Sequence, residues 1–364
     1  AAPGMDFPEY GSYQLSPAEI MAVSLDDPLE NILQINHIGS YFGADGLAID
    51  TGQTPPQSQQ DLSTRRLDPE LENAFDDNFQ ALEIWIGGDG RSGLFNQFLG
   101  ENLGDWFNLL NQGLLPTAIA NSDTHNLRTT FLATRNLVAS RVTTPGRLSG
   151  QAENLAAAVA AGKSIGSNGP SMRINATARF LGIARSAGLG VDERRQIPIS
   201  PGGELTVVVE LSTPLWAAVD TVDFYVNNQP ELTSPEGAAA RYGVCPDYQV
   251  TANDPEWVAQ EVTVVERLEG AARSDIRVTL TLPRVTEDTW VVAIAHGTDG
   301  ESSPMFPVVP EDLDPTDNQT LEDLTDDNLG QGGVLAYAFS NPLFIDVGGD
   351  GWQAPGVSNA CLLY

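Results

Sequence analysis

The stretch TAIANSDTH, residues 117–125, carries the pattern that decides the predicted fold. Its first four residues are small or apolar, as in a buried strand, and the polar residues that follow include Asp123 and His125. A buried strand that ends in polar side chains is typical of parallel sheets, whose binding residues gather at the carboxyl ends of the strands. We therefore expect a strand over 117–120 and a site directly after it.

The same arrangement occurs earlier in the chain. A short apolar run over 32–36 ends in Asn36-His37, and a second buried-strand candidate covers 81–86. Apolar residues at helical spacing predict a helix over 103–112, and an alanine-rich stretch predicts another over 151–161. This alternation of strands and helices indicates an α/β unit with a parallel sheet.

The pattern changes after residue 170. Strand-like runs at 205–211, 222–226, 276–282, 290–295 and 334–339 are separated by Gly, Pro, Asp and Asn. Such spacing without amphipathic helices is typical of an antiparallel β-sandwich. The sequence therefore predicts two domains, 1–172 and 173–364.

The charge balance excludes some partners. With 49 acidic against 18 basic residues the net charge is −31, which repels nucleic-acid phosphates and anionic lipids. No apolar run of about 18 residues is present, so we expect no membrane span. The chain opens at Ala1 rather than Met, and with the acidic surface this favours a processed protein that is secreted, periplasmic or on the cell surface. A specific cation-binding surface is the alternative interpretation of the acidity.

The two cysteines, Cys245 and Cys361, exclude a cysteine-based metal site because neither belongs to a Cys-x-x-Cys pair. They form one disulfide if the compartment is oxidising, or stay as thiols.

A metal site is the sharpest hypothesis for the strand ends. Asp123 and His125 stand two residues apart, so on an extended segment both side chains point to the same side and reach one cation. His37 also follows a strand end. Two histidines and one aspartate suit Zn, Mn or Fe. The alternative is a turn capped by Asp123 with a solvated His125.

Several blocks in the same order carry a resemblance to a known family. Asn36-His37 resembles an Asn-His-Pro strand end, Leu82-Glu83-Ile84-Trp85 resembles an Ile-Glu-Val-Trp strand, and Asn121–His125 resembles a Gly-Asn-Ser-Asp-Ser-His motif. Further similar blocks are Thr134-Arg135-Asn136, Ser167-Asn168-Gly169-Pro170 and Ser340-Asn341-Pro342. Together they resemble the PHP (polymerase and histidinol phosphatase) superfamily, in its carbaryl-hydrolase-like branch, over almost the whole chain.

The resemblance implies part of a distorted TIM-like PHP barrel followed by an antiparallel, Ig-like β-sandwich, that is, an α/β plus all-β fold. It implies two or three divalent metals (Zn, Mn or Fe) at the barrel mouth, with His37, Asp123 and His125 as ligands. Metal-activated water would hydrolyse a phosphoester, carbamate or amide bond of a small-molecule substrate. Arg135 would clamp an anionic group of the substrate or form a structural ion pair, and Glu83 would orient its neighbours.

The sequence departs from this family at its start. Members begin with a His-x-His strand, but no histidine precedes His37. The ligand set is therefore incomplete, and we expect a companion polypeptide that carries the N-terminal half of the barrel. The rival hypothesis is a non-catalytic, secreted structural or binding protein that retains the PHP scaffold.

Other polar residues have simpler interpretations. His296 ends a predicted sandwich strand, and we interpret it as structural. The acidic run between Glu311 and Asp327 is interpreted as a solvated loop, with a calcium site as the alternative because carboxylates suit that ion. Asp346 and Asp350 leave the same two possibilities open.

Overall fold

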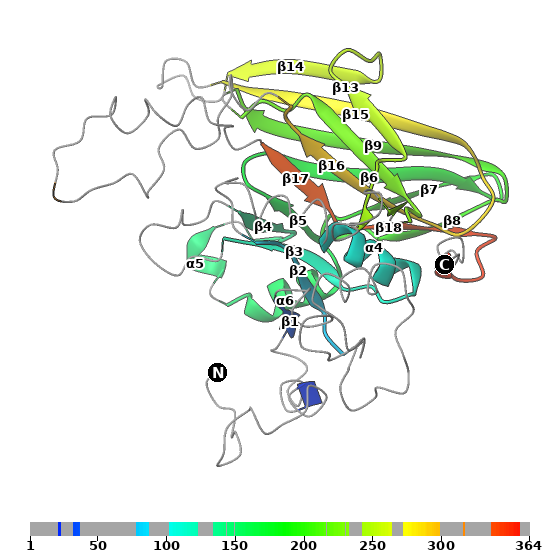
Figure 1. Ribbon diagram of the computed structural model, residues 1–364, viewed down its shortest axis with the longest axis horizontal. Helices are drawn as coiled ribbons and strands as arrows, with labels where there is room; N and C mark the ends of the chain where they lie inside the picture. Colours follow the sequence, from blue (N-terminus) through cyan, green and yellow to red (C-terminus); the bar gives the residue numbers. More distant parts are fainter. Residues whose placement is uncertain are drawn as a thin grey trace.

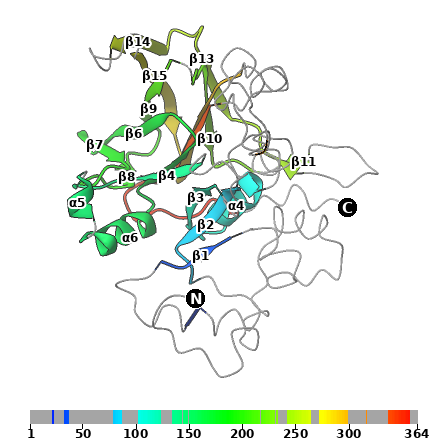
Figure 2. The ribbon, with the colours of Figure 1, turned by 90° about the vertical axis from the view of Figure 1, so that its left-hand side faces the viewer.

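The computed structural model describes residues 21–22, 32–36, 78–86, 102–122, 134–142, 144–148, 150–215, 217–229, 231–232, 242–263, 272–298, 316 and 336–356. These residues are arranged in three layers: a five-stranded sheet, an eight-stranded sheet, and a layer of parallel strands and helix (Figure 1). The turned view in Figure 2 shows the five-stranded sheet at one end of the molecule and the parallel strands towards the other.

The five-stranded sheet is antiparallel and forms one outer layer. Its strands, in spatial order, are β14 (Trp257–Thr263), β15 (Ala272–Val285), β9 (Gly203–Pro214), β6 (Ser171–Phe180) and β7 (Ile183–Gly188). In β9 the buried apolar side chains are Leu205, Val207, Val209 and Leu211, which lie on one face of the strand. This period of two turns the apolar face of the sheet towards the middle layer.

The middle layer is the eight-stranded sheet. Its main path runs β13 (Tyr248–Thr251), β10 (Thr221–Val226), β16 (Thr289–His296), β17 (Tyr337–Ser340), β5 (Ser164–Ser167) and β4 (Arg135–Val138). Two further strands branch from it, β18 (Leu343–Val347) beside β16 and β8 (Gln196–Ile199) beside β18. A separate small pair joins β11 (Glu231–Leu232) to β12 (Tyr242–Gly243).

Both faces of the middle sheet are covered. In β16, Val291, Ala293 and Ala295 belong to the core shared with the five-stranded sheet. Trp290, Val292 and Ile294 belong to a second core, which they share with the third layer. Because β16 is buried on both faces, its sequence is an unbroken apolar run rather than an alternating one.

The third layer consists of three parallel strands and a helix. The strands are β1 (Gln34–Ile35), β2 (Ala81–Ile86) and β3 (Thr117–Asn121), in that spatial order. The helix α4 (Leu103–Asn111) is buried along its whole length. The short helix α5 (Pro145–Leu148) and the helix α6 (Ala152–Ala160) follow β4.

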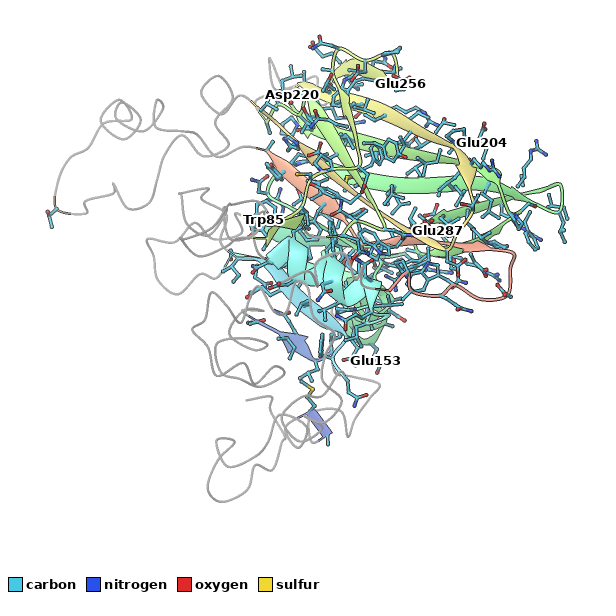
Figure 3. The ribbon with its side chains drawn as sticks, turned by 45° about the vertical axis from the view of Figure 1, so that its right-hand side comes forward. Trp85, Glu153, Glu204, Asp220, Glu256 and Glu287 are labelled. Carbon is cyan, nitrogen blue, oxygen red and sulfur yellow. The ribbon has the colours of Figure 1, made fainter. Side chains whose placement is uncertain are left out.

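Aromatic side chains connect the third layer to the middle sheet. Phe107 of α4 contacts the rings of Tyr225 and Trp290, with ring centroids 5.1 and 4.8 Å apart. Trp85 of β2 contacts Tyr337 and Phe339 of β17, and Figure 3 shows Trp85 where the two layers meet. The tryptophan Nε1 of Trp290 also donates to the Asn111 side chain at 2.8 Å.

The predicted fold class, a partial TIM-like barrel followed by an Ig-like sandwich, is wrong. Strand predominates, and β1, β2 and β3 form a three-stranded parallel sheet that does not close. A TIM barrel needs eight parallel strands with a helix after each. Strands β4 and β5, which lie within the predicted barrel segment, pair antiparallel with each other and join the middle sheet.

Side-chain amides at the outer edge of β3 give the physical reason. Asn341 accepts a hydrogen bond from Ala118 N at 2.8 Å and donates to Ala118 O at 3.0 Å. Asn136 makes the same pair of bonds with Ala120, at 2.9 and 2.8 Å. These two asparagines satisfy the positions where a fourth strand would bond, so the parallel sheet ends at β3.

The predicted boundary at residue 172 stays a prediction. Strands β4 and β5 lie before it, yet they belong to the same sheet as β10, β16 and β17.

Candidate functional site at the carboxyl ends of the parallel strands

The three parallel strands bring their carboxyl ends to one edge of the third layer. Asn36 follows β1 directly, Asn121 is the last residue of β3, and Ser122 follows it. In open parallel sheets this edge is where binding sites form, because loops leave it from several strands at once.

A buried carboxylate lies in β2 of this sheet. Glu83 is only 2% exposed, and its Oε1 accepts a hydrogen bond of 2.7 Å from Nδ2 of Asn121. The register between β2 and β3 shifts between Glu83 and Trp85, so β2 carries an irregularity next to this pair. The bond fixes the side chain of Asn121, which stands two positions before Asp123 in the sequence. Such a contact is of the kind expected if Glu83 orients its neighbours.

The three predicted metal ligands, His37, Asp123 and His125, lie outside the described residues. Whether they share a cation therefore stays a prediction. In the described part of the chain, no three His, Cys, Asp or Glu side chains are grouped as a metal would require.

Arg135 lies at the start of β4 and is half-buried. Its Nη1 donates to the backbone oxygen of Asn168 at 3.3 Å. Asn168 in turn accepts from Tyr337 N through Oδ1 at 2.8 Å and donates its own N–H to Tyr337 O at 3.1 Å. Arg135 is therefore anchored to the same strand, β17, that contacts Trp85 of the parallel sheet.

His296 forms a second polar site, which the sequence did not identify as a pair. Its Nε2 lies 3.0 Å from Oδ2 of Asp223, its Nδ1 lies 3.1 Å from Gly297 O, and its ring stacks on Tyr337 at 5.0 Å. The other carboxylate oxygen of Asp223 accepts from Gln249 at 2.8 Å. Since both ring nitrogens face acceptors, the geometry favours the doubly protonated imidazolium.

The electrostatics of His296 agree with this geometry. Burial by itself lowers the pKa of His296, but the hydrogen bond and charge of Asp223, with smaller contributions from Gly297 and Asp220, raise the pKa above 6.5 overall. The signal for this pair was present in the sequence. Asp223 interrupts the apolar run Val222–Val226, and a charge in a buried strand requires a partner.

Asp346, one of the two residues considered for calcium, organises a turn. Its carboxylate oxygens accept hydrogen bonds from Gly349 N at 3.0 Å and from Gly351 N at 3.1 Å, and also from the Gln196 side chain at 3.2 Å. Because N–H donors already point at both carboxylate oxygens of Asp346, these oxygens are not free to bind a cation. We therefore interpret Asp346 as a residue that stabilises the turn rather than as a calcium ligand. Calcium at the acidic run 311–327 stays a prediction, because apart from Thr316 those residues are outside the described part of the chain.

Cys245 is exposed, and Cys361 lies outside the described residues, so the disulfide also stays a prediction. Among the described residues, no helix is long and apolar enough to cross a membrane.

Comparison with known proteins gives no relative for this chain. No family model, no curated protein and no solved structure matches it. The resemblance to the PHP superfamily therefore stays a prediction that rests on the residues quoted above.

Proposed function

We propose that this protein is a metal-dependent hydrolase whose cation is held beside the carboxyl ends of β1, β2 and β3. The observation that carries the proposal is the hydrogen bond from Asn121, the last residue of β3, to the buried carboxylate of Glu83 within β2. The residues that follow β1 and β3 in the sequence include His37 and Asp123. A buried carboxylate that fixes a neighbouring side chain is the kind of support that ligand-bearing segments need.

The proposed ligands are His37, Asp123 and His125, a donor set suited to Zn, Mn or Fe. A divalent cation bound there supplies charge stabilisation and lowers the pKa of water. The bond cleaved is a phosphoester, carbamate or amide in a small molecule. Arg135 binds an anionic group of the substrate, held in place through Asn168.

Three protein ligands do not support a cluster of several metals, and in this proposal a companion polypeptide supplies the others. The strongly acidic surface suits a protein that works in a secreted, periplasmic or cell-surface setting.

The test begins with metal uptake. The purified chain is loaded with Mn or Zn, passed through a desalting column, and its metal content is measured by mass spectrometry. We expect His37→Gln, Asp123→Asn and His125→Gln each to lower the metal content severalfold. Two control variants, Glu153→Gln at an exposed position of α6 and His296→Gln in β16 of the middle sheet, should retain the metal content of the unmodified chain. Unchanged uptake in all three ligand variants would refute the site.

Hydrolysis is then assayed with p-nitrophenyl phosphate and p-nitrophenyl N-methylcarbamate. If metal binds without turnover, material isolated from its source with any associated polypeptide is assayed in the same way. Turnover only in the assembly supports the companion polypeptide. Bound metal without turnover in the assembly supports the non-catalytic scaffold instead.

A further inference from the structure

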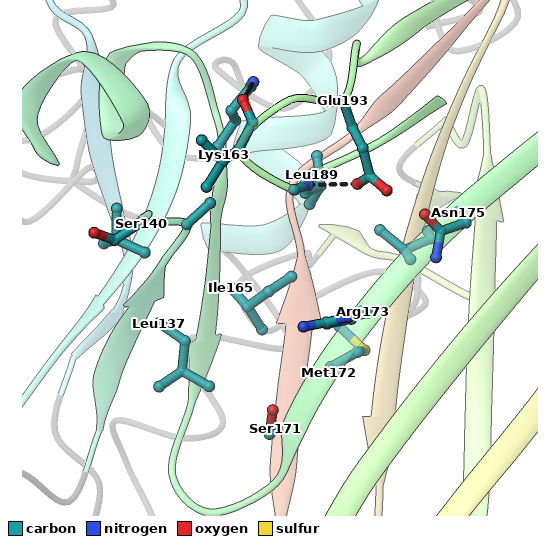
Figure 4. Close-up of a pocket in the computed structure, with 15 residues that line it drawn as sticks. Leu137, Ser140, Lys163, Ile165, Ser171, Met172, Arg173, Asn175, Leu189 and Glu193 are labelled. Carbon is teal, nitrogen blue, oxygen red and sulfur yellow. Dashed lines mark hydrogen bonds between the residues drawn. The ribbon is translucent and has the colours of Figure 1, made fainter. Parts of the chain in front are cut away.

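A cleft opens between the middle sheet and the five-stranded sheet. It is lined by residues 137–140 at the end of β4 and after it, by Lys163 directly before β5 and Ile165 within β5, and by residues 171–175 at the start of β6. Leu189, Gly190, Val191 and Glu193 complete the lining. Its volume is about 390 Å³, within the range of small-molecule sites. Figure 4 shows the labelled side chains arranged around this opening, contributed by both sheets.

The cleft exists because the five-stranded sheet does not cover the whole middle sheet. Strand β4 is at the end of the middle sheet. Strand β7 pairs with β6 only from Asn175 onward, so residues 171–174 have β9 on one side and no strand of the described chain on the other. The two uncovered edges face each other across the opening.

The floor of the cleft is apolar. Ile165, Met172 and Leu189 are buried members of the core between the middle sheet and the five-stranded sheet, while Leu137 is 37% exposed. Covering such partly wetted apolar surface is favourable, at about 25 cal/mol per Å².

The rim carries more positive than negative charge, although the whole protein is strongly acidic. Lys163 and Arg173 both line the cleft, and Lys163 is the only lysine of the chain. The Lys163 Nζ donates to Val191 O at 2.7 Å, which fixes the ammonium and leaves donors for another group.

The third charged residue of the rim, Glu193, is already engaged. Its Oε2 accepts from Gly190 N at 2.5 Å. Glycine leaves room for this close approach, because a Cβ at Gly188 or Gly190 would lie 2.2 or 2.6 Å from that oxygen and would displace the carboxylate. Glu193 therefore serves the turn and competes little for a ligand.

Arg173 keeps its guanidinium available. It lies opposite Glu210 in the register of β6 and β9, but the Glu210 carboxylate is paired with Arg277 at 2.6 Å. Within the described residues, the Arg173 side chain has no hydrogen-bond or ion-pair partner. A guanidinium with open donors is well suited to a carboxylate, which it binds through two parallel hydrogen bonds.

We propose that this cleft binds a small organic carboxylate with an apolar chain. The chain lies on the floor formed by Leu137, Ile165, Met172 and Leu189. Arg173 binds the carboxylate, and Lys163 adds positive potential. This site is separate from the proposed metal site and does not depend on it.

The test uses octanoate as the probe and the methionine methyl groups as reporters. The chain has four methionines, and only Met172 lines the cleft among the described residues. In protein labelled with ¹³C at the methionine methyls, we expect octanoate to shift the Met172 signal, assigned with Met172→Leu, in a saturable way. Octylamine, which has the same chain and the opposite charge, should leave that signal nearly unchanged at equal concentration.

Variants separate the charge from the apolar contact. Arg173→Gln should weaken octanoate binding at least tenfold, and Lys163→Met should weaken it by less. The matched control Arg185→Gln, an exposed arginine of β7, should bind like the unmodified protein. Arg173 is exposed, so its loss should not prevent folding. Saturable binding that is equally strong in Arg173→Gln, equal shifts with octylamine, or no Met172 shift at millimolar octanoate would each overturn the proposal.

Discussion

Replacement of Asn341 by leucine tests the asparagine edge of the parallel sheet. Asn341 is fully buried, and it bonds Ala118 N, Ala118 O and Ser164 O, all at 2.8 to 3.0 Å. Leucine has a similar volume but no polar atoms, so these three backbone groups would lose their partner in a dry environment. An unsatisfied buried group costs about 1–3 kcal/mol, so the expected loss is about 3 kcal/mol or more. That is a large part of the about 5–15 kcal/mol that stabilises a typical protein.

The measurement is urea unfolding followed by circular dichroism, together with hydrogen exchange at the Ala118 amide. Asn341→Leu should lower the unfolding free energy by the amount given and speed exchange at Ala118. The control Asn154→Leu, on the exposed face of α6, should stay within about 0.5 kcal/mol of the unmodified protein. A loss below about 1 kcal/mol for Asn341→Leu would mean that the edge is satisfied in another way, and the explanation for the open parallel sheet would fail.

Two further predictions concern the middle sheet and the five-stranded sheet. The pKa of His296 is higher in the folded protein than the 6.5 of the unfolded chain. The bond between protonated His296 and Asp223 therefore stabilises the folded protein fully at pH values below 6.5. This stabilisation is lost as the pH rises through the pKa that His296 has in the folded protein. The unfolding free energy lost in His296→Gln should thus be larger at pH 5.5 than at pH 8.5; equal losses contradict the charged pair. The turn between β6 and β7 places Leu181 at φ 50° and Gly182 at φ 80°, with Phe180 opposite Ile183. This two-residue turn favours Asn at its first position, so Leu181→Asn should raise the unfolding free energy by about 1 kcal/mol, and a decrease would count against it.

Local elements of the third layer were predictable from sequence because short-range patterns produce them. A strand was predicted over 81–86 and is β2, and the predicted helix 103–112 and strand 117–120 correspond to α4 and β3 within one residue at their ends. Apolar runs and helical spacing are local properties, and they place these segments correctly without knowledge of the rest of the chain.

The arrangement of these elements was not predictable in the same way. The edge of β3 is closed by Asn136 and Asn341, and nothing in a single sequence distinguishes an asparagine that replaces a strand from one in a loop. Likewise, Asp223 and His296 stand 73 positions apart, and only their adjacent strands bring them together. At the candidate site, sequence reasoning identified Glu83 but not its bond to Asn121.

The position of β17 has a consequence for the order of folding. This strand, Tyr337–Ser340, lies between β16 and β5 in the middle sheet. The sheet therefore lacks one of its inner strands until the chain has been synthesised beyond residue 340. Contacts such as Asn341 with Ala118 span 223 positions, and closing such long loops slows folding. While the chain is being synthesised, β5 can therefore pair with β4 but not yet with β17, and the edge of β5 that β17 later covers stays unpaired. The ribosome-bound protein should depend on chaperones that cover strand edges, and its native layers should form together and late.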